Sequence, residues 1–240
     1  MELRDKVVVI TGGGRGVGRS IALALAREGA RLALVARTES ELNAVCKEVE
    51  ALGGEAIAIP TDISDPKQIE DMAQETLNAF GTVDMVINNA AKGAIPGLLV
   101  QDTTVEDWDY VMNVNARGTF LVTKAFLPTL LAKHSGHVIN VETVVAKKGV
   151  ATAVAYCASK SAMLAFGQGL LDEVGPLGVR VTNVLPGPIN TKMRWDHNPD
   201  YPRDWVVEPE DVAQVVVNVL KMKDYVLLEE IAVRRLGSPE

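Results

Sequence analysis

The chain has 240 residues, of which 48% are hydrophobic and 23% are charged, a composition typical of a globular protein and not of a disordered or fibrous one. Its net charge of −7 disfavours a nucleic-acid partner, because such a partner needs a basic face against its phosphates. The N-terminal stretch MELRDKVVVITGG lacks the long apolar segment of a signal peptide, and no run reaches about 18 apolar residues. Two cysteines make no disulfide framework. We therefore expect a cytoplasmic protein that acts on a small molecule, with no nucleic-acid or membrane partner.

Short apolar runs alternate with helical patterns along the whole chain. Strands are predicted at 6–11, 31–36, 55–60, 83–88, 137–142, 179–186 and 229–235. Helices are predicted at about 16–29, 39–52, 66–80, 105–133, 154–175 and 209–222. Strands this apolar are buried on both faces, so the pattern predicts an α/β fold with one domain, residues 1–240. Its core is a Rossmann-like, doubly wound parallel sheet of about seven strands with helices on both faces.

The first predicted strand is followed by TGGGRGVGRS, residues 11–20. Its glycines let the backbone turn tightly and bring amides and a helix N-terminus against a pyrophosphate. The spacing Thr-Gly-x-x-x-Gly-x-Gly is neither G-x-G-x-x-G nor a P-loop. In open parallel sheets ligands bind beyond the carboxyl ends of the strands, so we expect a dinucleotide here; an ordinary loop is the alternative.

The second predicted strand ends next to Arg37, and Arg15 lies in the glycine turn. Dinucleotide sites that select NAD usually place an acid here, whereas an arginine accommodates a 2′-phosphate. NADP(H) is therefore favoured over NAD(H). Glu39 and Glu41 are the competing acids, but Thr38 with Glu41 fits a helix capping box. The alternative for Arg37 is a solvated surface charge.

Polar residues also follow the third and fourth predicted strands. Asp62 with Ile63 is a candidate to meet an adenine, while Asp65, before a proline, reads as a helix start. Asn88 and Asn89 lie at the end of the fourth strand, where a structural role is as plausible as contact with a cofactor.

Thr143 follows the fifth predicted strand, and Tyr156 and Lys160 lie four residues apart on the helix after it. Positions i and i+4 share a helical face, so the lysine can reach the phenol. A positive charge about 4 Å away would favour the phenolate by roughly 4 kcal/mol, or about three pKa units. We therefore expect Lys160 to lower the pKa of Tyr156, whose hydroxyl would then exchange protons near neutral pH.

The segment 190–206 combines Trp195, Tyr201 and Trp205 with charges and two prolines, and we expect it to be a substrate lid. The alternative is that these aromatic side chains anchor a surface loop to the core.

No metal site is expected at any of the three histidines. His134 and His137 flank a Ser-Gly turn and are interpreted as surface residues, and His197 has no partner visible in the sequence.

Together these motifs identify a family resemblance. TGGGRGVG, NNAA, NVN at 113–115, YCASK and PGPINT at 186–191 occur in one order from Thr11 to about Thr191. In this the chain resembles the short-chain dehydrogenases/reductases of the NADP-preferring type. The resemblance implies hydride transfer between a nicotinamide and a carbonyl or secondary alcohol, with Tyr156 as general acid/base.

The resemblance also implies roles for individual residues. Asn115, Thr143, Tyr156 and Lys160 match the family's catalytic tetrad. Thr143 would polarise the substrate oxygen, Lys160 would bind the nicotinamide ribose, and Asn115 would order a water. The implied cofactor-binding residues, besides Tyr156 and Lys160, are Thr11, Gly12, Gly14, Arg15, Gly16, Val17, Gly18, Arg37, Asp62, Ile63, Asn89, Ala90, Pro186, Gly187, Ile189 and Thr191.

The chain also departs from the family pattern. Thr143 stands in place of the usual serine, Ala91 in place of a glycine, and the carboxyl end lacks the frequent TGQ…VDGG ending. Family members often pair the helices predicted at 105–133 and 154–175 between subunits, so a homodimer or homotetramer is expected. Two rival functions remain: a non-catalytic dinucleotide-binding regulator or scaffold, and a sugar-nucleotide epimerase or dehydratase, for which the chain is short.

Overall fold

The computed structural model describes residues 2–238. Seven strands form one parallel sheet in the order β3-β2-β1-β4-β5-β6-β7. The strands are β1 (Val7–Thr11), β2 (Arg31–Ala36), β3 (Glu55–Pro60), β4 (Met85–Asn88), β5 (Gly136–Val141), β6 (Val179–Pro186) and β7 (Glu230–Val233). Strand order reverses between β1 and β4, which is where open sheets of this kind bind ligands. The predicted fold class, a single Rossmann-like domain, is confirmed.

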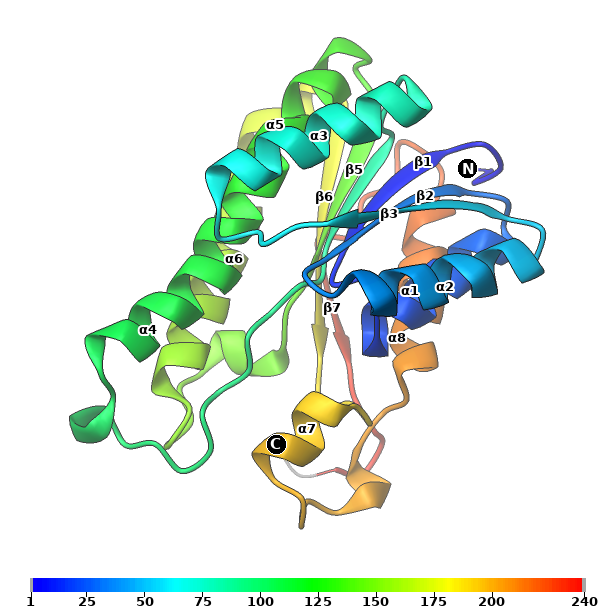
Figure 1. The fold of residues 1–240 in the computed structure, drawn as a ribbon. Coiled ribbons are helices and arrows are strands. Elements are labelled where there is room, and N and C mark those ends of the chain that lie inside the picture. The colour runs from blue at the N-terminus through cyan, green and yellow to red at the C-terminus, as the bar shows by residue number, and fades with distance from the viewer. Residues whose placement is uncertain (1, 239–240) are drawn as a thin grey trace.

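Helices cover both faces of the sheet (Figure 1). On one face lie α1 (Gly16–Arg27), α2 (Glu39–Ala51) and α8 (Pro209–Leu220); on the other lie α3 (Pro66–Phe80), α4 (Val105–Met112), α5 (Gly118–Ala132) and α6 (Val154–Val174). Side chains alternate along each strand. Val8 therefore packs on the face that α1, α2 and α8 cover, and Val9 packs on the opposite face. Within residues 2–238, no helix has the length and apolar character that crossing a membrane requires.

The helix predicted at 105–133 is interrupted by a π-helical turn at Asn113–Arg117. Asn115 in this turn is fully buried. Its side-chain oxygen accepts the Lys92 backbone N–H at 2.7 Å, and its side-chain nitrogen donates to the Lys92 carbonyl at 3.0 Å and to the Ser159 hydroxyl at 2.9 Å. These bonds join the turn to the loop after β4 and to α6. The break separates α4 from α5, and such single turns are frequent at functional sites.

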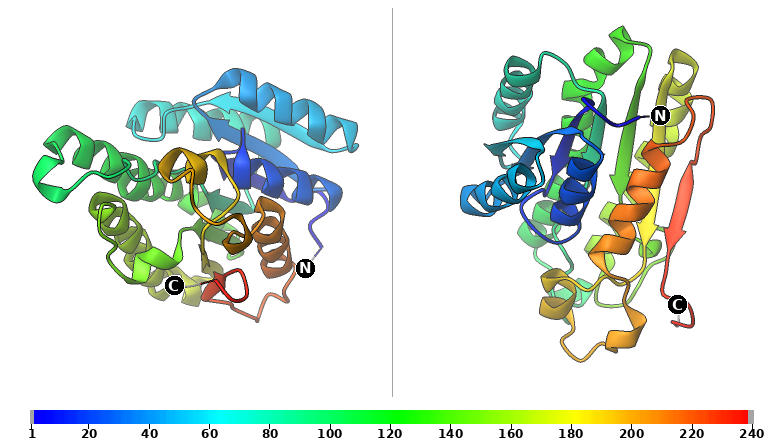
Figure 2. Two further views of the ribbon diagram at one scale, coloured as in Figure 1. Left: turned by 90° about the horizontal axis from the view of Figure 1, so that it is seen from below. Right: turned by 90° about the vertical axis from the view of Figure 1, so that its right-hand side faces the viewer.

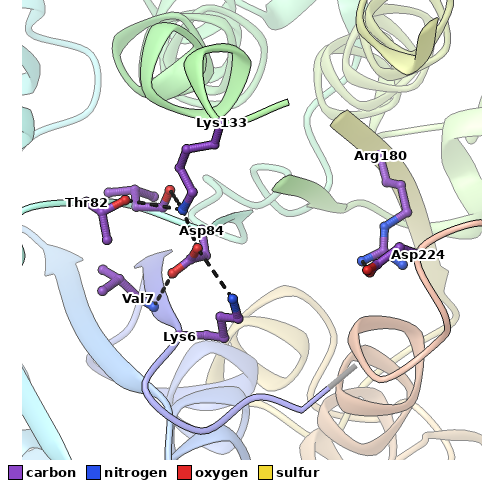
Figure 3. A network of polar contacts seen from close by, with 8 residues as sticks. Lys6, Val7, Thr82, Asp84, Lys133, Arg180 and Asp224 are labelled. Atoms are coloured by element: carbon purple, nitrogen blue, oxygen red, sulfur yellow. Dashed lines mark hydrogen bonds and ion pairs between the residues drawn. The ribbon is translucent and has the colours of Figure 1, made fainter. Parts of the chain in front are cut away.

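A charged network holds the opposite, amino-terminal edge of the sheet (Figure 3). Asp84, directly before β4, accepts a hydrogen bond from the Val7 backbone N–H at 2.9 Å and pairs with Lys6 and Lys133. Lys133 also donates to the Thr82 hydroxyl at 3.2 Å. The network therefore joins the starts of β1 and β4 to the end of α5, away from the carboxyl ends of the strands.

His137 is buried, so the interpretation of this residue as a surface histidine is wrong. It is 1% exposed, and its Nε2 lies 2.8 Å from the Thr182 hydroxyl on β6. Burial, with a smaller contribution from Arg180, lowers the pKa of His137 to about 3. His137 lies in β5 between two neighbouring strands, paired with Met85 of β4 and with Arg180 of β6, and this encloses its side chain, while His134 stays exposed.

Candidate active site

A cavity of about 570 Å³ opens at the carboxyl ends of the strands. Figure 2 (left) looks onto this end of the molecule, where the short helix α7 (Lys192–His197) lies across the strand ends. Of the residues expected to form the site, Gly12, Gly14, Arg15, Gly16, Val17, Arg37, Asp62, Ile63, Asn89, Ala90, Tyr156, Lys160, Ile189 and Thr191 line this cavity. Those not among the lining residues are Thr11, Gly18, Asn115, Thr143, Pro186 and Gly187.

The glycine turn is shaped by close contacts that exclude side chains. Gly12 has a φ of +67°, and a Cβ there would lie 2.8 Å from Nδ2 of Asn89. At Gly18 a Cβ would overlap the Gly12 carbonyl oxygen. Thr11 connects the turn to the loop after β4. Its hydroxyl accepts hydrogen bonds from the backbone N–H groups of Asn89 and Ala90 at 3.0 Å each.

The α1 N-terminus is open to a ligand. Its N-cap, Arg15, makes no side-chain capping hydrogen bond, so the side chain satisfies none of the first-turn amides. An uncapped N-terminus beside a glycine cradle fits an anionic pyrophosphate, because amides and helix dipole both favour negative charge there. The residues of this turn therefore fit the dinucleotide that the sequence predicts.

Two arginines line the cavity close to the end of β2 and the glycine turn. Arg37 donates to the Tyr110 hydroxyl at 2.8 Å, and Arg15 pairs with Glu41 at 3.3 Å. The expected capping box is wrong: Thr38 is the N-cap of α2, but its side chain makes no capping hydrogen bond. Glu41 instead faces the glycine turn, because the turn brings Arg15 over the first turn of α2.

The two aspartates that follow β3, Asp62 and Asp65, have different roles. Asp62 lines the cavity, and its carboxylate accepts hydrogen bonds from the Ser64 backbone N–H at 2.9 Å and the Ser64 hydroxyl at 2.7 Å. Asp65 caps α3 by accepting from the backbone N–H of Lys67 at 2.9 Å, which confirms the predicted helix start.

The two asparagines at the end of β4, Asn88 in the strand and Asn89 directly after it, have different roles. Asn88 is buried and donates to the Thr123 hydroxyl at 2.9 Å and to Oδ1 of Asn140 at 3.0 Å, so its role is structural. Asn89 lines the cavity while donating to the Thr11 carbonyl at 2.9 Å.

Tyr156 and Lys160 both line the cavity, but they do not make the electrostatic pair expected from the sequence. Lys160 is 1% exposed, and its ammonium donates to the Val141 carbonyl at 3.1 Å and to the Met163 sulfur at 3.4 Å. Burial raises the pKa of Tyr156 to about 12, and the cation that opposes this rise is Arg194 of α7, not Lys160. The expected lowering of the Tyr156 pKa is therefore not found, because the lysine side chain turns toward β5.

Thr143 lies directly after Glu142 at the end of β5. Its hydroxyl accepts the Val145 backbone N–H at 3.5 Å, which starts a short 3-10 helix, Val144–Lys147. The hydroxyl hydrogen is thus not used by this bond.

In the segment 190–206 the aromatic side chains pack mainly on neighbours within the segment. Tyr201 and Trp205 meet edge to face, and the Arg203 guanidinium lies 4.4 Å from the Trp195 ring. The cavity is lined instead by Thr191, Lys192, Met193, Asp196 and His197.

The sequence interpretation missed several lining residues, among them Glu142, Lys92 and Tyr110. Glu142 carried a usable signal, since it is an acidic residue at the end of the apolar run HVINVE. Lys92 and Tyr110 carried none, because only the tertiary fold brings the Tyr110 ring within 5.3 Å of the Lys92 ammonium.

Comparison with known proteins agrees with this geometry. The short chain dehydrogenase family matches residues 6–202. An uncharacterized oxidoreductase of Staphylococcus aureus (strain MRSA252) is 34% identical over 233 residues, 97% of this chain and 98% of that protein. An alcohol dehydrogenase of the archaeon Thermococcus sibiricus, complexed with 5-hydroxy-NADP, superposes with a TM-score of 0.91 at 30% identity over 99% of this chain and 100% of its own. A metagenomic short-chain oxidoreductase in complex with NADP has a TM-score of 0.86 at 32% identity, covering 97% and 98%.

The family match covers most of the chain, and the sequence relative is aligned over nearly the full length of both proteins. The sheet order and the cavity at the strand ends are those on which the dinucleotide interpretation depends. The chain therefore belongs to the short-chain dehydrogenase family of oxidoreductases, which use a nicotinamide cofactor.

Proposed function

We propose that this protein is an NADPH-dependent oxidoreductase that reduces a carbonyl group to a secondary alcohol, with Tyr156 as the proton donor. One observation carries the proposal: a single cavity is lined by Tyr156, Lys160, the glycine turn and Arg37. A nicotinamide bound there would supply the hydride. The turn residues Gly12, Gly14 and Gly16 would hold the pyrophosphate, Asp62 and Ile63 the adenine, and Ile189 and Thr191 the nicotinamide end.

The high pKa of Tyr156 favours the reductive direction. With a pKa of about 12, the phenol carries its proton at neutral pH and can donate it to a carbonyl oxygen as an alkoxide develops. Oxidation would need the phenolate, so we expect the reverse reaction to speed up as pH rises.

The remaining tetrad residues act around this proton donor. Thr143 would polarise the carbonyl oxygen with its free hydroxyl hydrogen, and Lys160 would bind the nicotinamide ribose. The Asn115 amide is already bonded to Lys92 and Ser159, so we assign its side chain to positioning the loop and α6. Any water ordered by Asn115 would therefore have to bind its main chain.

The substrate would enter beside Tyr156. A second cavity of about 20 Å³ shares Tyr156 with the larger one and has mostly apolar walls, including Ile95, Leu98, Val111 and Val154. We infer that a small apolar group of the substrate lies there and that segment 190–206 covers the larger cavity, which its residues Thr191, Lys192 and Met193 line.

The preference for NADPH rests on charge at the end of β2. Arg37 and Arg15 line the cavity, and the strand ends in Ala36 where an acid would repel a 2′-phosphate. Two solved relatives of the same fold are described with NADP-type cofactors.

Replacing Arg37 with alanine should raise the KM for NADPH by at least about tenfold and change the KM for NADH little, because charge-assisted bonds are worth about 1.5–3 kcal/mol. Steady-state kinetics with both cofactors measure this. The control is Arg27→Ala, which removes an exposed arginine from the end of α1. Equal changes in both KM values would contradict the assignment.

The function itself is tested by following the consumption of NADPH and NADH against a panel of ketones, aldehydes, quinones and acyl thioesters. Turnover with at least one carbonyl and faster reaction with NADPH support the proposal. Cofactor binding without turnover on any carbonyl would identify a non-catalytic dinucleotide-binding protein instead.

We also infer a homo-oligomer formed through α4, α5 and α6. Trp108, Phe120 and Val154 are 39%, 44% and 41% exposed on these helices. Phe120→Glu should reduce the mass measured by size-exclusion chromatography with light scattering to that of a protomer. The control is Leu52→Glu, at a 42% exposed leucine beyond the end of α2. A wild type that already elutes as a monomer would refute the inference.

A further inference from the structure

The site holds a carboxyl group that the proposed reaction does not use. Glu142 follows β5, and its backbone N–H donates to the Val184 carbonyl at 2.8 Å, so sheet pairing fixes its main chain. Its side chain is 5% exposed, and neither carboxyl oxygen has a hydrogen-bond partner within the described chain. A buried acid without partners is costly, and a purely structural carboxyl would be hydrogen-bonded.

Geometry and charge both single out Lys160 as the partner of Glu142. The two side chains line the same cavity, and the Lys160 ammonium donates at 3.1 Å to the carbonyl of Val141, the residue directly before Glu142. Lys160 of α6 is the cation that acts on Glu142, while Glu230 of β7 acts as a like charge. Glu230 is itself neutralised by an ion pair with Lys147 and accepts a hydrogen bond from Gln168 at 2.7 Å. The phenol of Tyr156, also on α6, experiences the charge of Glu142 as well.

Among the described residues, Glu142 is the anion whose charge shifts the pKa of Lys160. The two hydrogen-bond acceptors of Lys160 are a backbone carbonyl and a thioether, both neutral. Burial lowers the pKa of Lys160 to about 8, and Glu142 is the group that opposes the fall. A neutral amine would no longer place a positive charge beside the nicotinamide ribose that Lys160 is proposed to bind.

We propose that Glu142 is a positioning residue that keeps the buried Lys160 ammonium charged beside Tyr156 and the cofactor cavity. This inference rests on the proposed function for the use of the Lys160 charge, whereas the coupling between Glu142 and Lys160 does not depend on that function. Burial raises the pKa of Glu142 and lowers that of Lys160, so the two groups titrate as a coupled pair in which the carboxylate and the ammonium stabilise each other's charge.

The sign of the pH effect follows directly. Lys160 is active as the ammonium, and its charge is lost as pH rises through its pKa. Without the Glu142 carboxylate this pKa falls further, so the loss begins at lower pH.

The test is an NMR titration of the whole protein with ¹³C-labelled lysine and glutamate, using Lys160→Met and Glu142→Gln to assign the two resonances. The Cε resonance of Lys160 should titrate near pH 8 in the wild type. In Glu142→Gln its midpoint should fall by about one pH unit or more, a tenfold change in the ionisation constant. Glu229→Gln is the control, because it makes the same charge change at an exposed residue directly before Glu230.

A Lys160 midpoint that moves by less than about 0.3 pH unit in Glu142→Gln, or equally in Glu229→Gln, would overturn the proposal. If Glu142→Gln does not fold, the wild type still decides: the Glu142 carboxyl and the Lys160 amine should titrate over the same pH range. A Glu142 carboxyl that stays protonated while Lys160 loses its proton would overturn the proposal.

The titration needs no turnover, so it separates the two proposals. A failed carbonyl panel with the expected titration would leave the Glu142–Lys160 coupling standing, and active enzyme with an unshifted midpoint would remove only the coupling. In active enzyme, the alkaline fall of the reduction rate should also begin about one pH unit lower in Glu142→Gln than in wild type.

Discussion

Tyr156→Phe should lower kcat/KM for NADPH-dependent carbonyl reduction by at least about 100-fold while NADPH still binds. The substitution removes only the phenolic O–H, and a positioned general acid typically contributes about 10²–10⁴ in rate. The Tyr156 phenol is expected to carry that proton at neutral pH, because burial raises its pKa to about 12. Rates come from NADPH absorbance, and cofactor binding from fluorescence titration.

Tyr201→Phe is the matched control for this experiment. It removes a tyrosine hydroxyl from the segment after β6 but keeps the ring on which the Arg194 guanidinium stacks, 4.7 Å from the centroid. We expect its kcat/KM to stay close to that of the wild type. A Tyr156→Phe enzyme that retains more than about a tenth of wild-type activity would exclude the tyrosine as the essential acid.

Gly18→Ala should abolish NADPH binding under conditions in which the wild type is saturated. The added Cβ would overlap the Gly12 carbonyl oxygen and lie 2.7 Å from Nδ2 of Asn89, so the turn must move. Overpacking of this kind costs about 1–3 kcal/mol, and we expect the free energy of unfolding to fall by that amount. Fluorescence titration measures the binding, and chemical denaturation measures the stability.

The control for the glycine turn is Gly169→Ala. Gly169 lies on α6, and a Cβ there would meet nothing within 4 Å. Alanine is the better helix former, so this variant should unfold no more easily than the wild type and should bind NADPH normally. Normal NADPH binding by Gly18→Ala would show that the close approach of helix and turn is not needed for the cofactor.

Much of the fold could be predicted because it depends on local pattern. Buried strands read as apolar runs, and alternation with helices requires parallel crossover connections, so the seven-stranded sheet followed from spacing alone. The cap of α3 at Asp65 was equally local. The π-helical turn at Asn113–Arg117 was not, because its stability comes from bonds between Asn115 and the distant residues Lys92 and Ser159.

The candidate site divides in the same way. Residue types at the strand ends indicated which side chains would meet, since the carboxyl ends of parallel strands share one edge, and most of the expected cofactor residues do line one cavity. The electrostatics were not predictable. Helical spacing suggested that Lys160 would act on Tyr156, yet the ammonium turns to the Val141 carbonyl and the opposing cation for the phenol is Arg194.

The sequence by itself determined the strand-helix order, the place of the site and the residue types available for proton and cofactor chemistry, because each follows from neighbours in the chain. Only the tertiary structure decided which of those groups are buried together. It enclosed His137 beside Thr182 and left Glu142 with Lys160 as its counter-charge. Desolvation depends on all the atoms that surround a group, and those atoms come from segments far apart in the sequence.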